Sequence, residues 1–354
     1  MSIDVAVVGA SGRIARTKHL PALNNLQAMG RIRRICVVSR DLGSLKSLHR
    51  DFPSVIPMTY EQVLADSDIR IVLDASGPKS RLDVVRAALE VGKHVLTEKP
   101  LGLTSHESQE LYDRATKAGV VASMVQDKLF TPGYQALASV LKEEKLGTIT
   151  NITGEFGYWV DTGVDESRPM QRPSWNYQTS QGGDIVSDLF THWTYMLRMV
   201  DDIDFVSAVS ATYFDKRRNE YGKLFDSDVP DTLFVTGKCK SGILFDIRNS
   251  WVMRPFTPFT LVVNGEIATT RTTPQKCEIF RSSGAVGETP EEALTHHRED
   301  EFLVLWQHFL DKVILGVPDV SGFRTGLLAG FVCDAINESL SRNSIQIPVG
   351  DSHG

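Results

Sequence analysis

The chain has 354 residues, more than a single hydrophobic core usually holds, so two domains are expected. Hydrophobic residues make up 42% and charged residues 23%, which is ordinary for a soluble enzyme. The net charge of −6 argues against a general nucleic-acid binder, because such proteins usually carry a net positive charge. Four dispersed cysteines lie at no metal-ligand spacing, and no apolar run reaches the length of a membrane span. We expect a cytoplasmic protein without a metal site, a secretory signal, or a nucleic-acid or membrane partner.

The first third of the chain alternates short apolar runs with helical patterns. Because such alternation is typical of parallel strands joined by right-handed crossovers, it predicts a doubly wound Rossmann-type sheet. The strands are expected at 5–8, 35–38, 69–73, 94–96 and 120–125, and helices at 81–91 and 105–117.

A glycine-rich turn follows the first strand and opens a helix. Its sequence is Gly-x-Ser-Gly-Arg-Ile, with Gly9, Ser11, Gly12, Arg13 and Ile14 as candidate cofactor-binding residues. Glycines there permit a tight turn, and the backbone N–H groups of the helix N-terminus favour a pyrophosphate. The second glycine comes one residue later than in the usual fingerprint, and a purely structural turn would have the same composition.

The tip of the second strand bears on the choice of cofactor. An acidic residue usually occupies this place and binds the ribose of NAD, but here Ser39 and Arg40 stand there. A hydroxyl followed by a guanidinium suits the 2′-phosphate of NADP, so the sequence favours NADP over NAD. Asp41 would instead bind an adenosine ribose if the strand ended one residue later.

Two further strand ends complete the expected cofactor edge. Ser76, Gly77 and Pro78 follow the third strand, where small residues leave room for a dinucleotide to cross the sheet. Thr97-Glu98-Lys99-Pro100 follows the next strand, so Glu98 and Lys99 are candidate cofactor-binding residues at the edge where ligands of such sheets bind. A surface Lys-Pro turn would also account for this tetrapeptide.

Beyond residue 125 the pattern changes to β-rich runs with one helical stretch. The sequence predicts domains at 1–125 and 126–354, the second an α+β domain with a large, mostly antiparallel sheet. Its strands are expected within 148–159, 207–213, 232–238, 243–247, 260–264 and 276–280, and helices at 185–200, 299–314 and 323–341. Packing of the last helix on the first domain stays open.

Four motifs together resemble the Gfo/Idh/MocA family of dehydrogenases. They are the glycine turn, the Ser76-Gly77-Pro78 turn, the Val95–Gly102 stretch, and Gly182-Gly183 followed by Asp188 and His192. The resemblance covers almost the whole chain. It implies an NAD(P)-dependent oxidoreductase that acts on a secondary alcohol of a sugar, glycoside or cyclitol, and a homodimer or homotetramer.

The chain also departs from the family pattern. Lys79-Ser80-Arg81 stands where a histidine is common, and Gln126-Asp127-Lys128 stands where an Asn and an Arg are common. With residues 171–177, the second departure looks like a branch that includes sugar 3-dehydrogenases, which would make pyranose C3 the reacting carbon.

The resemblance implies a catalytic set that also makes physical sense. Asp188 and His192, four residues apart on a predicted helix, share one face, and both Lys99 and His192 are suited to acid–base work. Asp188 would orient a second hydroxyl, and the nicotinamide would supply the hydride chemistry. Helix capping by Asp188 and a satisfied core histidine at 192 are the alternatives that the residues alone leave open.

Further substrate contacts are expected from Lys128, and from Arg172 and Trp175 in a Pro-flanked loop. An aromatic side chain there would suit the apolar face of a pyranose. A loop that is merely a packed structural turn would also explain this sequence.

Two other functions stay open. One is an enzyme that keeps and recycles a tightly bound NAD(H), and the other is a regulator that binds the dinucleotide without catalysis.

Overall fold

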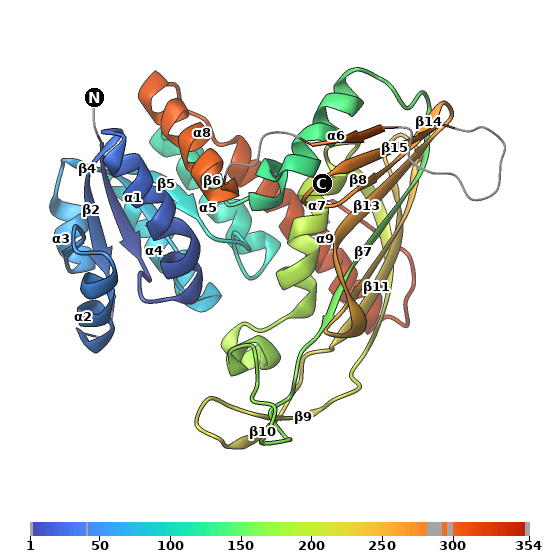
Figure 1. Cartoon of the computed structure of the whole chain (residues 1–354), viewed down its shortest axis with the longest axis horizontal. Helices are drawn as coiled ribbons and strands as arrows, with labels where there is room; N and C mark the ends of the chain where they lie inside the picture. Colours follow the sequence, from blue (N-terminus) through green and yellow to red (C-terminus); the bar gives the residue numbers. More distant parts are fainter. Residues whose placement is uncertain (1–2, 40–41, 282–291, 296–299, 351–354) are drawn as a thin grey trace. The chain divides into compact units, whose positions relative to one another are not determined.

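The computed structural model describes residues 3–39, 42–281, 292–295 and 300–350 (Figure 1). The contacts divide the chain into two compact units, Met1–Phe130 with Glu299–Gly330, and Thr131–Arg298 with Phe331–Gly354. The predicted fold class is confirmed: the described residues form a parallel six-stranded sheet and, separately, a mostly antiparallel nine-stranded sheet.

In the first unit, the strands are ordered β3-β2-β1-β4-β5-β6, and all neighbouring pairs are parallel. This is the strand order of dinucleotide-binding folds, whose ligands lie at the carboxyl edge of the sheet. The elements are β1 (Ile3–Val8), η1 (Ala15–His19), α1 (Leu20–Ala28), β2 (Ile32–Val38), α2 (Leu42–Asp51), β3 (Ile56–Pro57), α3 (Tyr60–Ala65), β4 (Ile69–Asp74), α4 (Pro78–Glu90), β5 (His94–Thr97), α5 (Ser105–Ala118), β6 (Ala122–Met124), η2 (Asp127–Phe130), α8 (Glu301–Leu315) and the first part of α9 (Ser321–Ser341).

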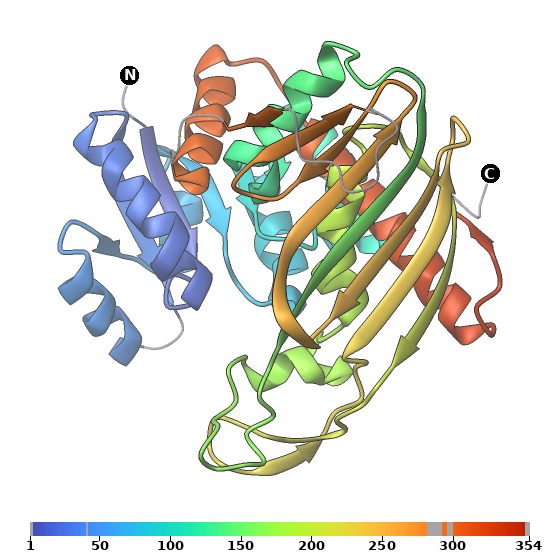
Figure 2. The ribbon, with the colours of Figure 1, turned by 45° about the vertical axis from the view of Figure 1, so that its right-hand side comes forward.

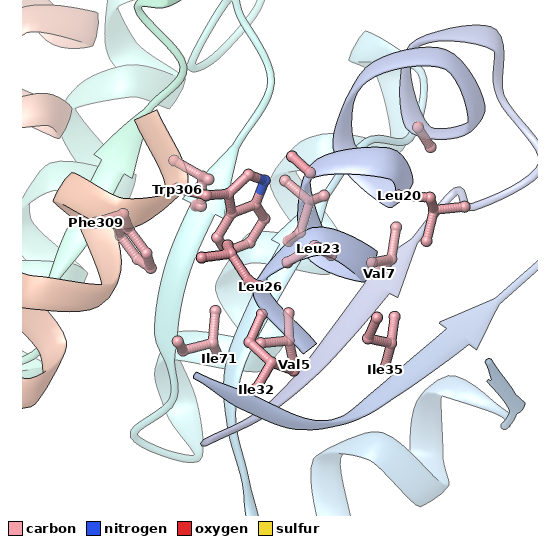
Figure 3. Packing of buried hydrophobic residues seen from close by; sticks show 14 of the residues in the cluster. Val5, Val7, Leu20, Leu23, Leu26, Ile32, Ile35, Ile71, Trp306 and Phe309 are labelled. Carbon is pink, nitrogen blue, oxygen red and sulfur yellow. The ribbon is translucent and has the colours of Figure 1, made fainter. Parts of the chain in front are cut away.

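The core of this unit includes a late segment of the chain. The central strand β1 is buried along its whole length, as its continuous apolar sequence predicts. Figure 3 shows Trp306 and Phe309 of α8 beside Leu23 and Leu26 of α1, and all four side chains are buried in one cluster. The first unit therefore extends beyond the predicted range 1–125, because α8 closes the core on the α1 side.

The second unit contains the nine-stranded sheet, in the order β16-β15-β14-β13-β7-β12-β11-β8-β17 within the described residues, with β7 and β12 parallel. Its elements are α6 (Pro132–Lys142), β7 (Ile149–Trp159), η3 (Ser174–Tyr177), η4 (Thr179–Gln181), η5 (Val186–Phe190), α7 (Thr191–Leu197), β8 (Ile203–Ala211), β9 (Lys216–Arg218), β10 (Leu224–Asp226), β11 (Thr232–Cys239), β12 (Leu244–Ser250), β13 (Val252–Gly265), β14 (Ala268–Thr272), β15 (Cys277–Arg281), β16 (Glu292–Leu294), β17 (Ile347–Pro348) and the end of α9.

Helices of the second unit lie along one face of its sheet (Figures 1 and 2). Gly154 of β7 makes the close approach of α7 possible, since a Cβ there would lie 2.8 Å from the ring of Trp193. Ser339 of α9 accepts a hydrogen bond from the backbone N–H of Ala208 in β8. The sheet thus has a face covered by α7 and α9.

The middle of the chain shows how local patterns mislead. The regular helix expected at 185–200 is a π-helical turn, η5, followed by α7, which ends at Leu197. Helix α6 was not predicted, although its first residue, Pro132, is a favoured helix start. Among the helices of the described residues, none is long and apolar enough to cross a membrane.

Candidate active site

The first unit holds an open pocket of about 590 Å³ at the carboxyl edge of its parallel sheet. Its wall comes from the glycine turn after β1, the tip of β2 and the turn after β4, as expected for a dinucleotide site. The lining residues are Val8, Gly9, Ser11, Gly12, Val38, Ser39, Tyr60, Ala75, Ser76, Gly77, Ser80 and Val84.

Gly9 explains why the pocket can form. Its φ of +78° is a conformation that side chains disfavour, and a Cβ there would lie 2.7 Å from the backbone of Ala75 and Ser76. The two strand-end turns can therefore lie against each other only with glycine at this position. Because the approach leaves backbone around the opening, the site fits a pyrophosphate as the sequence predicts.

The other predicted cofactor residues lie in different places. Ser39 donates a hydrogen bond to the Ser11 hydroxyl at 3.0 Å, so the β2 tip and the glycine turn are joined. Arg13 is exposed, Ile14 packs against the hydrophobic core, and Pro78 is the first residue of α4. Arg40, which motivated the preference for NADP, lies outside the described residues, as does Asp41.

Arg81 ties the pocket to the segment that carries Lys99. This buried guanidinium donates to Oδ2 of Asp74 at 2.9 Å, to the carbonyl of Ser76 at 3.0 Å and to the carbonyl of Pro100 at 2.6 Å. Asp74 also accepts from the Thr97 hydroxyl. The residue that departs from the family pattern thus links the turn after β4 to the turn after β5.

Lys99 follows β5 directly, at the carboxyl edge of the same sheet. The backbone N–H of Lys99 donates to Oε2 of Glu98 at 3.3 Å, and the N–H of Glu98 donates to the carbonyl of Asp74 at 2.8 Å. The Glu98 side chain is buried and lies 2.9 Å from Nε2 of His19. Neither His19 nor Arg81 was predicted as part of the site.

In the second unit, a pair of glycines brings a loop against the start of η5. Gly182 has a φ of +84°, and a Cβ on Gly183 would lie 2.3 Å from the carbonyl oxygen of Trp175. Asp184 then accepts from the backbone N–H groups of Val186 and Ser187, which starts the helix. The loop with Arg172 and the helix with Asp188 are therefore held together.

Arg172 and Asp188 form the charged centre of this half. Nη2 of Arg172 lies 2.6 Å from Oδ2 of Asp188 and 2.8 Å from Oδ1 of Asn176, and the guanidinium stacks on Trp251 with 4.3 Å to the ring centroid. Burial disfavours the charge on Arg172, but Asp188 together with Tyr158 and Tyr177 outweighs this effect, so the pKa of Arg172 is raised. The Asp188 side chain is thus held in place by Arg172, and its oxygen atoms can accept hydrogen bonds from hydroxyl groups.

His192 lies in α7, and its side chain is buried against Phe259. Its Nδ1 is 2.6 Å from the hydroxyl of Tyr195, one helical turn further on, and this contact fixes the orientation of the imidazole ring. Tyr195 was not predicted as a site residue, although the spacing of three residues on a helix is a signal that could have identified it.

The remaining predicted contacts differ in their surroundings. Lys128 in η2 pairs with Asp127 at 2.5 Å, whereas the Trp175 side chain is 38% exposed. Trp175 lies in the same loop as Arg172, but the neighbour that stacks with Arg172 is Trp251. Tyr177 is buried beside Trp251, and burial raises its pKa to about 12.

The parallel sheet, its glycine turn and the pocket define the first unit as a dinucleotide-binding module. A family model for an oxidoreductase family with an NAD-binding Rossmann fold matches residues 3–126, and a model for the Gfo/Idh/MocA C-terminal domain matches residues 134–271. The chain belongs to the Gfo/Idh/MocA family, and the predicted resemblance is confirmed.

Two curated relatives are named as sugar dehydrogenases. The chain is 35% identical over 201 residues to the D-xylose dehydrogenase of Paenarthrobacter nicotinovorans, and 29% identical over 165 residues to the levoglucosan dehydrogenase of Pseudarthrobacter phenanthrenivorans. These matches cover 55% and 46% of this chain, and 51% and 41% of the two relatives. The chain therefore matches about half the length of each.

Solved structures share the fold along the whole chain. A levoglucosan dehydrogenase in complex with NADH and levoglucosan gives a TM-score of 0.87 at 18% identity, covering 99% of this chain and 100% of the other. A super-repressor mutant of Gal80p from Saccharomyces cerevisiae gives 0.80 at 17% identity, covering both chains fully. The fold alone therefore does not separate an enzyme from a regulator.

Proposed function

We propose that this protein is an NAD(P)-dependent dehydrogenase that transfers a hydride between the nicotinamide and a secondary alcohol carbon of a sugar, glycoside or cyclitol, with C3 of a pyranose favoured. The observation that carries this proposal is the attachment of Lys99 to the dinucleotide pocket. Arg81 contacts both the turn that lines the pocket and the carbonyl of Pro100, so a lysine stands beside the edge where the cofactor would bind.

The residues divide the work as follows. When bound, the dinucleotide supplies the hydride chemistry at its nicotinamide. Lys99 and His192 handle the proton of the reacting hydroxyl, and Nε2 of His192 takes this part because Nδ1 is engaged with Tyr195. Asp188 accepts a second hydroxyl and orients the ring, while Arg172 holds Asp188 in place.

A carbohydrate substrate is supported by the chemistry of the second unit and by the names of the two relatives. Asp188, Arg172 and Asn176 offer both acceptors and donors to hydroxyl groups. Trp175 adds an exposed aromatic face in the same loop, and Lys128 is a further proposed contact. Sugars present this combination of hydroxyl groups and an apolar ring face.

The proposed preference for NADP rests on Ser39 at the pocket and on Arg40 next to it in the sequence. The test is a panel of pentoses, hexoses, anhydrosugars and glycosides, each assayed with NAD and with NADP. Turnover of at least one sugar is expected, with a higher kcat/KM for NADP. Silence of the whole panel with both cofactors would refute the dehydrogenase, and a clear advantage for NAD would refute the preference.

The same protein sample tests the recycling alternative. A tightly bound cofactor would travel with the purified protein and absorb in the reduced-nicotinamide band after addition of substrate alone. We expect no such absorbance until dinucleotide is added.

We also propose a cytoplasmic location, which is supported by the four cysteines, all buried and free.

We further propose a homodimer or homotetramer formed through the nine-stranded sheet. Val209 of β8 and Phe234 of β11 are directly paired, yet they are 52% and 44% exposed. Their neighbours Ala208 and Leu233 are buried, so the exposed pair lies on the face opposite the core. Sedimentation should show an oligomer that Phe234→Glu dissociates, and a monomeric native protein at micromolar concentration would contradict it.

A further inference from the structure

We propose that His19 and Trp306 are positioning residues that hold Glu98 as an oriented carboxylate next to Lys99. The inference deepens the proposed dehydrogenase and rests on it for its effect on turnover. The three side chains come from η1, α8 and the turn after β5, and together they form a hydrogen-bonded relay that we call the Trp306–His19–Glu98 relay.

The relay has a defined direction. Nε1 of Trp306 lies 3.1 Å from Nδ1 of His19, and Nε2 of His19 lies 2.9 Å from Oε1 of Glu98. An indole nitrogen can only donate, so Nδ1 must be the accepting nitrogen of the imidazole. Nε2 then carries the proton and donates it to Glu98, which accepts through a carboxylate oxygen.

The members of the relay are buried, so water cannot easily substitute for one of them. The side chains of His19 and Trp306 are fully buried, and the ring of Phe302 packs edge-on against His19 at 4.8 Å between centroids. Water therefore cannot readily take the place of a missing partner, and removal of one member leaves a buried polar group unsatisfied.

The far end of the relay reaches Lys99. The other carboxylate oxygen of Glu98, Oε2, accepts from the backbone N–H of Lys99 at 3.3 Å. The N–H of Glu98 is itself fixed by the carbonyl of Asp74. An indole on α8 thereby orients the residue that the proposed reaction uses, although 207 positions separate Lys99 from Trp306 (306 − 99).

The first test needs no substrate. In the dinucleotide-saturated protein, ¹⁵N NMR of labelled histidines should show His19 as the neutral tautomer with the proton on Nε2, its signal identified by loss in His19→Gln. In Trp306→Phe, Nδ1 loses its donor, so its ¹⁵N signal should move downfield while Nε2 keeps its proton. A wild-type His19 protonated on Nδ1, or a spectrum unchanged in Trp306→Phe, would overturn the relay.

The second test measures turnover with a sugar that the wild-type protein oxidises. His19→Leu removes both hydrogen bonds and should lower kcat by about tenfold or more, with the dissociation constant of the dinucleotide within twofold of wild type. His19→Gln can still accept from Trp306 and donate to Glu98, and it should retain at least fivefold more activity than His19→Leu.

Phe309→Leu is the matched control, because Phe309 belongs to the same buried cluster and helix but has no polar atom. It should lower Tm while leaving kcat near wild type. Equal losses of kcat in Phe309→Leu and His19→Leu at equal loss of Tm would reduce the relay to a packing role and overturn the proposal. If the wild-type protein oxidises no sugar, the proposed function fails, and the NMR result still decides the relay.

Discussion

Nη2 of Arg172 and Oδ2 of Asp188 are 2.6 Å apart, and the two side chains keep only 15% and 24% of their surface exposed. Asp188→Asn leaves Arg172 without its counter-charge and weakens the acceptor for the substrate. A hydrogen bond to a charged group contributes about 1.5–3 kcal/mol, so we expect kcat/KM to fall by roughly 10- to 100-fold. Steady-state kinetics on the best sugar measures this.

The control for this pair lies in the same unit. Arg168 and Asp165 are 3.7 Å apart but 60% and 59% exposed, so Asp165→Asn should change neither kcat/KM nor Tm appreciably. Equal kinetic effects of the two substitutions would contradict a substrate role for Asp188.

Lys99→Met should lower kcat by about 10²- to 10⁴-fold, because it removes a group proposed to handle the hydroxyl proton. Dinucleotide affinity should change less than threefold, as measured by fluorescence of the reduced cofactor. Lys79→Met, at an exposed lysine of α4, removes the same charge and should leave kcat unchanged. A Lys99→Met protein with near wild-type kcat would exclude Lys99 from catalysis.

Ser39→Asp should reverse the cofactor preference. A carboxylate at the tip of β2 repels a 2′-phosphate and accepts hydrogen bonds from a ribose. We expect NADP binding to weaken by roughly tenfold, about 1.4 kcal/mol, while NAD binding holds or improves. Ser54→Asp adds the same charge at an exposed position and should not alter the ratio of the two affinities. An unchanged ratio in Ser39→Asp would place the ribose elsewhere.

Gly9→Ala and Gly30→Ala separate crowding from backbone conformation. Both glycines have positive φ, +78° and +72°, but a Cβ on Gly30 would meet nothing within 4 Å. Gly30→Ala should therefore cost only the conformational term of about 1–2 kcal/mol. Gly9→Ala adds a clash with the backbone of Ala75 and should abolish dinucleotide binding. Calorimetry gives both values, and similar results for the two variants would refute the close-approach argument.

His94 should make the protein sensitive to mild acid. Burial, with a smaller contribution from Arg70, lowers the pKa of His94 from 6.5 to about 4, and Nδ1 of His94 accepts from the backbone N–H of Val121 at 3.0 Å. Since the unfolded chain binds this proton more readily, the contribution to stability is complete above pH 6.5 and is lost as the pH falls to 4.

The loss should amount to about 1–3 kcal/mol in the free energy of unfolding. His94→Asn keeps an acceptor but does not titrate, so its stability should change less between pH 6.5 and 4, as measured by urea unfolding. Parallel pH profiles for wild type and His94→Asn would show that other groups dominate.

The sequence predicted correctly those features that depend on residues close together in the chain. Continuous apolar runs indicated the strands of the first unit, because parallel strands are buried on both faces. The glycine turn indicated the pocket, since the backbone conformation of Gly9 is itself a local property. Asp188 and His192 stand on one helical stretch as expected, but their roles stay predictions.

Contacts between side chains that are far apart in the sequence could not be predicted in this way. Nothing near His19 indicates that Trp306 donates to it, because that contact depends on where α8 packs. Arg81 was recognised only as a departure from the family pattern, and its three acceptors lie on two different strand-end turns. The π-helical turn in η5 likewise has no recognisable local signature.

The place of α8 in the first core has a consequence for synthesis on the ribosome. Trp306 and Phe309 are needed to bury the apolar side of α1, yet residues 131–298 are made before them. At ~5–20 residues per second, translation of this intervening stretch takes roughly 10–30 s. During that time the nascent nucleotide-binding unit exposes a helix face, so we expect chaperone capture of ribosome-bound chains that end before residue 306 and its disappearance once α8 has emerged.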